Sequence, residues 1–166
     1  MGMEIERKFL VVGDGWRKEA VGSTYRQGYI RTQGQATVRV RIAGQTGYLT
    51  LKGPTQGLSR LEFEYEIPVT DADQLLQELC DRPLIEKVRY RLLYGGLPWE
   101  VDEFNGDNEG LVLAEVELDT PDQPIDYPPW IGQEVSHDAR YFNANLAQHP
   151  FSEWRSEGSG SCTDVN

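Results

Sequence analysis

Cysteine, positive charge and long apolar runs are all scarce in this sequence. Only two cysteines, Cys80 and Cys162, occur among 166 residues, and their spacing indicates neither a disulfide nor a zinc site. No run of about 18 apolar residues is present, and no apolar segment marks the start, so we expect neither a spanning helix nor a secretory signal. These shortages predict a protein of the reducing cytoplasm.

The charge balance is acidic. The chain has 16 Lys and Arg residues against 27 Asp and Glu residues, a formal net charge of −11. A surface that binds nucleic acid or an anionic membrane needs an excess of Lys and Arg, so we expect neither partner. An anionic ligand would have to be a small molecule, bound by a local group of basic side chains.

The length fits one domain. A chain of 166 residues is large enough to bury a core without a metal or disulfide. We expect a single domain over residues 1–150. The end of the chain, residues 151–166, is Gly/Ser-rich and polar, and is predicted to be a disordered tail.

Most of the sequence alternates apolar and polar residues between short turns rich in Gly, Pro, Asp and Asn, a pattern typical of antiparallel strands. The predicted strands span residues 3–12, 25–32, 36–43, 46–52, 59–68, 84–94, 97–104 and 110–119. Two helices are predicted, "TDADQLLQEL" at 70–79 and "SHDARYFNANLAQ" at 136–148. The expected fold class is α+β, dominated by one antiparallel sheet with a C-terminal helix.

The polar face of these strands is almost entirely charged. In "TVRVRI", for example, Arg39 and Arg41 share one face and the aliphatic residues take the other. A sheet with one face in water gives such alternation without any function. However, Glu, Arg and Lys dominate here, and basic and acidic residues lie on different strands. This segregation favours an enclosed charged site.

Eight strands can close into a small barrel, which would enclose the charged faces. The basic residues in its lumen would be Lys8, Arg39, Arg41, Lys52, Lys87, Arg89 and Arg91. The acidic residues would be Glu4, Glu6, Glu62, Glu64, Asp102, Glu115 and Glu117. Desolvating so many charges is unfavourable if they meet only one another, so we expect a wet lumen with a charged ligand.

The two kinds of charge indicate the ligand. Arg offers planar bidentate donors to phosphate oxygens and Lys a compact positive charge, so the basic residues suit a polyphosphate. Clustered carboxylates would repel that anion unless they held a divalent cation. Mg²⁺ or Mn²⁺ takes oxygen ligands and bridges carboxylates to phosphates, so a metal cofactor is expected.

The segment "EIERK", residues 4–8, resembles the ExExK signature of the CYTH superfamily, the triphosphate tunnel metalloenzymes. The resemblance extends through "VRVR", "LTLK", "SRLEFEYEI", "EKVRYR" and "LAEVEL". It implies an eight-stranded antiparallel tunnel that acts on a triphosphate with Mg²⁺ or Mn²⁺. The metal ligands it implies are Glu4, Glu6, Glu115 and Glu117, joined by Glu62, Glu64 and Asp102. The triphosphate ligands it implies are Arg39, Arg41, Lys52, Lys87 and Arg89, while Arg91 faces the same way by spacing alone.

Several roles have two interpretations. Lys8 is either a general base toward water or only a phosphate ligand. Tyr29 either orients Lys8 in catalysis or is a barrel aromatic whose hydroxyl is satisfied elsewhere. The C-terminal helix either closes one end of the tunnel or covers an apolar face.

The family that the sequence resembles includes enzymes that catalyse several different reactions. The link "GDGWRKEAVGS", residues 13–23, is shorter than the helix that cyclase relatives have there, and no aromatic pocket for a purine or thiazole is evident. We therefore expect hydrolysis of inorganic tripolyphosphate to pyrophosphate and phosphate. The alternatives are a class IV adenylate cyclase, a thiamine or nucleoside triphosphatase, and a non-enzymatic polyphosphate- or nucleotide-binding protein. Apolar outer strand faces with few covering helices also suggest a homodimer.

Overall fold

The computed structural model describes residues 2–154. Its strands are β1 (Gly2–Val11), β2 (Val21–Ile30), β3 (Thr37–Ala43), β4 (Thr46–Lys52), β5 (Ser59–Ile67), β6 (Ile85–Tyr94), β7 (Leu97–Phe104), β8 (Val112–Glu117) and β9 (Ile131–Glu134). Its helical segments are α1 (Val69–Glu78), α2 (Asn143–Leu146) and the 3-10 turns η1 (Gly15–Glu19), η2 (Gly106–Asn108) and η3 (Ala139–Tyr141). None of the helices in this part of the chain has the length and apolar composition needed to span a bilayer.

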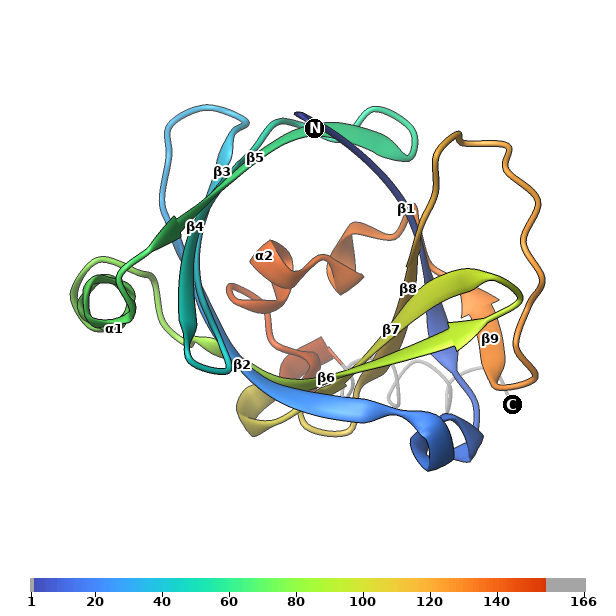
Figure 1. Cartoon of the computed structure of the whole chain (residues 1–166). Helices are drawn as coiled ribbons and strands as arrows, with labels where there is room; N and C mark the ends of the chain where they lie inside the picture. The colour runs from blue at the N-terminus through green and yellow to red at the C-terminus, as the bar shows by residue number, and fades with distance from the viewer. Residues whose placement is uncertain (1, 155–166) are drawn as a thin grey trace, which may run out of the picture.

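Eight of the strands form a closed antiparallel barrel, seen along its axis in Figure 1. The strand order is β5-β4-β3-β2-β6-β7-β8-β1, and the first half of β1 closes the ring by pairing with β5, with Met3 opposite Leu61. The α+β fold predicted from the alternation, an eight-stranded antiparallel barrel with a few helices, is therefore confirmed.

The register of the barrel places opposite charges beside one another on its inner face. Lys8 of β1 lies opposite Glu115 of β8, and Arg89 of β6 lies opposite Asp102 of β7. Directly opposite residues in an antiparallel pair project to the same side of the sheet. The charged faces of the strands consequently meet inside the barrel.

Much of the hydrophobic core lies outside the barrel, between the strands and the segments that cover them. A further cluster packs inward-facing residues such as Leu113 against the C-terminal segment at one end of the barrel. Helix α1 packs Leu76 against Val40 on the outer side of the sheet. Gly47 allows this close approach, because a Cβ there would lie 2.8 Å from the Cβ of Ala72. On another side, Trp99 and Trp130 belong to an aromatic cluster that covers the outward faces of β1, β7 and β8.

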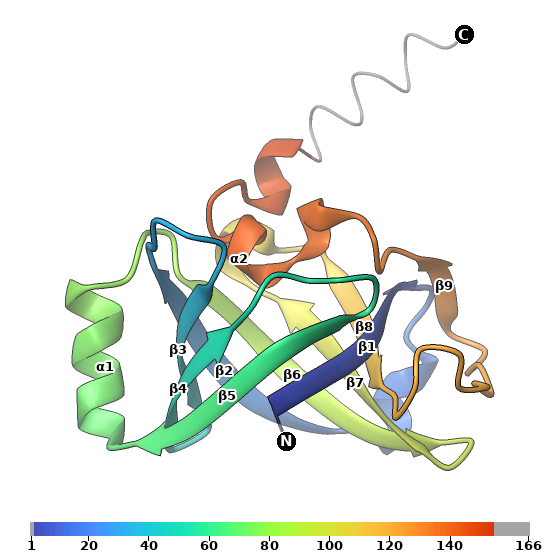
Figure 2. The ribbon, with the colours of Figure 1, turned by 90° about the horizontal axis from the view of Figure 1, so that it is seen from above.

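The C-terminal part differs from the sequence prediction. Strand β9 was not predicted, and it pairs with the end of β1 outside the ring of eight. The predicted helix over 136–148 is broken into η3 and α2, because Phe142 between them has an extended backbone with ψ of 134°. In Figure 2 this segment lies across one end of the barrel.

The structure describes four residues beyond position 150, the predicted boundary of the domain. Residues 151–154 are helical, and Trp154 is only 7% exposed. Its ring packs edge-on against Tyr141 and Phe151, with centroids 5.1 Å and 4.9 Å away. Phe151 and Trp154 bury a large apolar area although the residues around them are polar. The average composition of this segment does not reveal that burial, so composition alone assigned both residues to the tail. The remaining tail, including Cys162, lies outside the described residues.

Candidate functional site

A cavity of about 460 Å³ occupies the interior of the barrel. It is lined by the predicted Tyr29 and by all the charged residues predicted for the lumen except Asp102. These are Glu4, Glu6, Lys8, Arg39, Arg41, Lys52, Glu62, Glu64, Lys87, Arg89, Arg91, Glu115 and Glu117. The structure thus brings together side chains from seven of the strands. Most of the cations are buried, while Arg91, Glu64 and Glu117 are exposed at the edges of the cavity.

Three residues form a buried group that we call the paired cluster: Lys87, Arg89 and Asp102. The Lys87 ammonium donates to Oδ2 of Asp102 at 2.7 Å, and Arg89 donates Nε to Oδ1 at 2.7 Å and Nη2 to Oδ2 at 2.8 Å. Burial opposes ionisation of Asp102, yet Arg89 and Lys87 hold its pKa well below the usual range. Burial lowers the pKa of Lys87 to about 7 in spite of Asp102.

The prediction of Asp102 as a metal ligand does not agree with this geometry. Both of its oxygens are engaged by cations, and its side chain is 1% exposed and does not line the cavity. Strand alternation correctly predicted that the Asp102 side chain points inward. The alternation could not reveal that Lys87 and Arg89 of the neighbouring strand neutralise Asp102.

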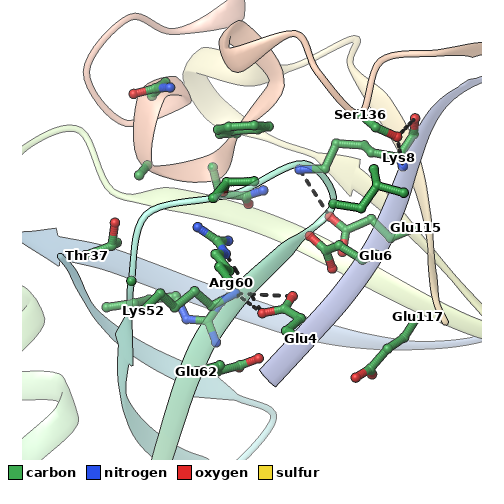
Figure 3. Close-up of a pocket in the computed structure, with 18 of the residues that line it drawn as sticks. Glu4, Glu6, Lys8, Thr37, Lys52, Arg60, Glu62, Glu115, Glu117 and Ser136 are labelled. Atoms are coloured by element: carbon green, nitrogen blue, oxygen red, sulfur yellow. Dashed lines mark hydrogen bonds and ion pairs between the residues drawn. The ribbon is translucent and has the colours of Figure 1, made fainter. Parts of the chain in front are cut away.

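A second group, the carboxylate cluster, consists of Glu4, Glu6, Glu115 and Glu117 on β1 and β8. Figure 3 shows Glu6 beside Glu115, with Glu117 further along the same wall. Burial, followed by the charges of Glu115 and Glu4, raises the pKa of Glu6 to about 8. Burial and the charges of Glu4 and Glu6 also raise the pKa of Glu117. This wall therefore carries more negative charge than its neighbours balance.

Two members of the carboxylate cluster do have cationic partners. Oε1 of Glu115 lies 3.4 Å from the Lys8 ammonium. Burial acts to raise the pKa of Glu115, but the charges of Lys8 and Arg89 outweigh burial and lower that pKa. Glu4 lies 3.0 Å from the Lys52 ammonium and 3.9 Å from Nε of Arg60. Arg60 was not predicted for the lumen. Its position two residues before Glu62 on the same strand face was the available signal.

Lys8 is held by the segment that closes the barrel. Its ammonium donates to the backbone carbonyl of Tyr141 at 3.2 Å, and its backbone N–H donates to Oγ of Ser136 at 2.9 Å. The Tyr29 hydroxyl instead accepts from Nε2 of Gln27 at 2.8 Å. Within residues 2–154, no hydrogen bond joins Tyr29 to Lys8. Both side chains line the same cavity.

Two neutral residues that the sequence did not single out connect the basic side of the cavity. Gln27 is fully buried, and its Oε1 accepts from Nε of Arg41 at 2.8 Å. Asn143 of α2 accepts from the Lys87 ammonium at 2.9 Å and lines the cavity. The C-terminal segment therefore closes one end of the barrel, the first of its two predicted roles.

The donor set suits a hard divalent cation, because the carboxylate cluster offers only oxygen atoms. Among residues 2–154, however, no three acidic, His or Cys side chains are already placed to hold a metal ion. Glu6 and Glu4 are close enough for a hydrogen bond that favours a protonated Glu6. A cation would replace that proton and draw the carboxylates together.

Comparison with known proteins adds four findings. A profile of the CYTH domain matches residues 2–151. An inorganic triphosphatase of Acetivibrio thermocellus is 51% identical over 155 residues, which cover 93% of this chain and 99% of that protein. An inorganic triphosphatase of Nitrosomonas europaea is 41% identical over 150 residues, 87% of this chain and 96% of that protein. A crystal structure of an inorganic triphosphatase, 39% identical, has a TM-score of 0.63 and covers 86% of this chain and 96% of that chain.

Proposed function

This chain belongs to the CYTH domain family, as the "EIERK" motif predicted, and on that premise we propose that it hydrolyses inorganic tripolyphosphate to pyrophosphate and phosphate. The observation that carries the proposal is the enclosed cavity in which buried Arg39, Arg41 and Lys52 face a wall of carboxylates. Such a cavity fits a small, highly charged anion. The activity of the two similar proteins supports the choice of inorganic triphosphate.

The basic residues would bind the phosphates. Arg39, Arg41 and Arg89 present planar guanidinium groups, and Lys52 and Lys87 present compact ammonium groups. Nε of Arg39 is buried and has no hydrogen-bond partner among the described residues. A phosphate oxygen would satisfy it. Arg91, more exposed, would contact the outer end of the substrate.

The carboxylates would hold Mg²⁺ or Mn²⁺. Glu4, Glu6, Glu115 and Glu117 would supply most of the oxygen ligands, with Glu62 and Glu64 on the adjacent strand β5. A bound divalent cation would neutralise charge on the phosphoryl group being transferred. Asp102 is not included, because Lys87 and Arg89 already engage it.

Lys8 would act as a phosphate ligand rather than as a general base. Its ammonium is positioned as a donor, between Glu115 and the Tyr141 carbonyl. Tyr29 would help to position the basic wall through Gln27. Lys8→Arg keeps a cation whereas Lys8→Met removes it, so partial activity in Lys8→Arg alone would support a binding role. Equal loss in both variants would favour the general base.

One assay tests the proposed reaction. Purified protein is supplied separately with tripolyphosphate, ATP and thiamine triphosphate, with Mg²⁺ or Mn²⁺, while phosphate, pyrophosphate and cyclic AMP are measured. We expect pyrophosphate and phosphate from tripolyphosphate, little turnover of the other substrates, and none after chelation. Cyclic AMP from ATP would identify a cyclase instead. Tight binding of tripolyphosphate without turnover under either metal would identify a binding protein.

A homodimer would cover an apolar strip on the outside of the barrel. The strip joins Met3, Leu51, Leu61, Phe63 and Tyr65, all exposed on adjacent strands. Sedimentation velocity would give the mass of a dimer, reduced to that of a monomer in Phe63→Glu. A monomeric wild type would contradict this assembly.

A further inference from the structure

One tyrosine, on the inner face of β2 opposite Lys87, contacts three arginines of the basic wall. The ring centroid of Tyr25 is 4.9 Å from the guanidinium carbon of Arg41, 5.1 Å from that of Arg89 and 5.9 Å from that of Arg91. Its hydroxyl also accepts from Nη2 of Arg91 at 2.5 Å. Tyr25 is 3% exposed, so its ring is shielded from bulk water.

The position of Tyr25 separates it from the residues that would touch substrate. Arg41, Arg89 and Arg91 all line the main cavity, whereas Tyr25 does not. A second hollow of about 250 Å³ is lined by Tyr25 together with Arg41 and Arg91. The tyrosine thus contacts the arginines without lining the main cavity.

The three arginines differ in their other partners. Arg89 is bound by Asp102, and Arg91 donates Nε to Glu100 at 3.0 Å. In residues 2–154 Arg41 has no carboxylate partner, and its side-chain hydrogen bond goes to the neutral Gln27. Burial, together with the charges of Arg39 and Arg89, lowers the pKa of Arg41 to about 9. Arg41 therefore depends most on a neighbour that favours its positive charge.

The face of an aromatic ring favours a cation without neutralising it. The ring quadrupole attracts guanidinium groups, and the attraction strengthens when both partners are desolvated. A carboxylate at the same place would compete with a phosphate for Arg41. An aromatic ring orients the guanidinium and leaves its full charge for an anion.

We propose that Tyr25 is a positioning residue that holds Arg41, Arg89 and Arg91 as one set of phosphate donors. The inference rests on the proposed function for its ligand, a triphosphate anion. The ring accounts for most of the effect, because the hydroxyl contacts only Arg91, which Glu100 also holds.

The test varies the electrostatics of the ring at nearly constant shape. Position 25 is substituted with Phe and then with mono-, di- and trifluorinated phenylalanine, which progressively weaken the negative ring face. Each variant is assayed for kcat and KM with tripolyphosphate, and for tripolyphosphate binding by calorimetry in chelator. We expect Tyr25→Phe to stay within about twofold of wild type in KM and Kd, and the trifluorinated variant to weaken both by about tenfold. The change in kcat should be under about threefold, because the ring touches no reacting atom.

Tyr25→Leu removes the ring and is compared with Tyr127→Leu, the same change at an exposed tyrosine that lies outside the cavity lining and outside the apolar strip. A Tyr25→Leu variant that fails to fold leaves the fluorinated series as the test. A purely packing role predicts no trend with fluorination, and a flat series would overturn the proposal. If the wild-type protein binds tripolyphosphate but does not hydrolyse it, the proposed function is overturned. The binding measurements on the fluorinated variants would still test the role of Tyr25. Wild type that does neither would overturn both.

Discussion

The paired cluster and the carboxylate cluster lie on neighbouring walls of one barrel and differ in how their charges are balanced. In the paired cluster, Asp102 is engaged by both Lys87 and Arg89, and all three are buried. In the carboxylate cluster, Glu6 has Glu4 and Glu115 as its main charged neighbours, and its pKa is raised to about 8. The first arrangement is complete within the protein. The second requires a proton or a cation from outside.

This difference separates charges that support the fold from charges that serve a ligand. Removing one partner of a buried ion pair strongly destabilises the protein, because the other charge remains buried and unpaired. Removing the charge of a carboxylate that is crowded by other carboxylates stabilises the protein, although a ligand site is lost. The same isosteric change, carboxylate to amide, should therefore have opposite effects on stability in the two clusters.

The largest effect on stability is expected from Asp102→Asn. Lys87 and Arg89 would lose their shared counter-charge, so the free energy of unfolding should fall by about 3–5 kcal/mol. Urea denaturation at neutral pH in chelator measures this. Asp73→Asn is the matched control, since Asp73 pairs with Arg26 at a half-exposed site and should contribute under about 1 kcal/mol. Equal losses in the two variants would contradict a special role for the paired cluster.

Glu6→Gln should reduce tripolyphosphate hydrolysis by at least about 100-fold, because a proposed metal ligand is lost. Its unfolding free energy in chelator should be unchanged or higher than that of wild type, because a buried like charge is removed. Glu78→Gln, on the exposed side of α1, serves as the control for both measurements. A variant that keeps full activity, or is destabilised like Asp102→Asn, would remove the distinction between the clusters.

The pH dependence of stability should follow from Glu6 in the metal-free protein. Its pKa is about 8 in the folded state and about 4.5 in the unfolded chain, so in this window the folded protein holds a proton that the unfolded chain has released. Stability from this group is present below pH 4.5 and is lost as pH rises toward 8. Lys87, with its pKa lowered to about 7, acts in the opposite direction only between about pH 7 and 10.5.

The measurement is therefore made between pH 5 and 7, where the titration of Lys87 does not oppose that of Glu6. Over it, the difference in unfolding free energy between wild type and Glu6→Gln should widen steadily in chelator, with wild type becoming the less stable. Adding Mg²⁺ should narrow the difference by stabilising the ionised carboxylate. A constant difference across this range would mean that Glu6 ionises as it does in water.

The smallest effect is expected where neutral side chains join the basic wall. Tyr29→Phe removes one hydrogen bond, that from Gln27, so activity should fall by no more than about fivefold. Steady-state kinetics with tripolyphosphate measures the loss. A fall of two orders of magnitude would instead place the Tyr29 hydroxyl in the chemical step.

Much of the site could be predicted because strand alternation is a local property. Glu4, Glu6 and Lys8 share a face in any extended conformation, as do Arg39 and Arg41. Arg60 and Gln27 were missed for different reasons. Arg60 has the same spacing as its neighbours and was overlooked, whereas Gln27 carries no charge and gains its role through hydrogen bonds with Arg41, Tyr29 and Asn143.

The end of the chain was harder to predict because its stability comes from distant contacts. Strand β9 is four residues long and exists by pairing with β1. Trp154 is buried because Tyr141 and Phe151 pack around it. Neither feature has a periodic pattern long enough to detect.

The order of residues along each strand predicts that the charged residues occupy one side of an antiparallel sheet, because successive side chains of a strand alternate between its faces. The same order predicts the mixture of arginines and carboxylates that suits a phosphate and a cation. Which charges neutralise one another depends on the folded barrel, because cross-strand register joins segments far apart in the chain. Asp102 and Glu6 follow the same alternation, yet the register places one between two cations and the other among carboxylates.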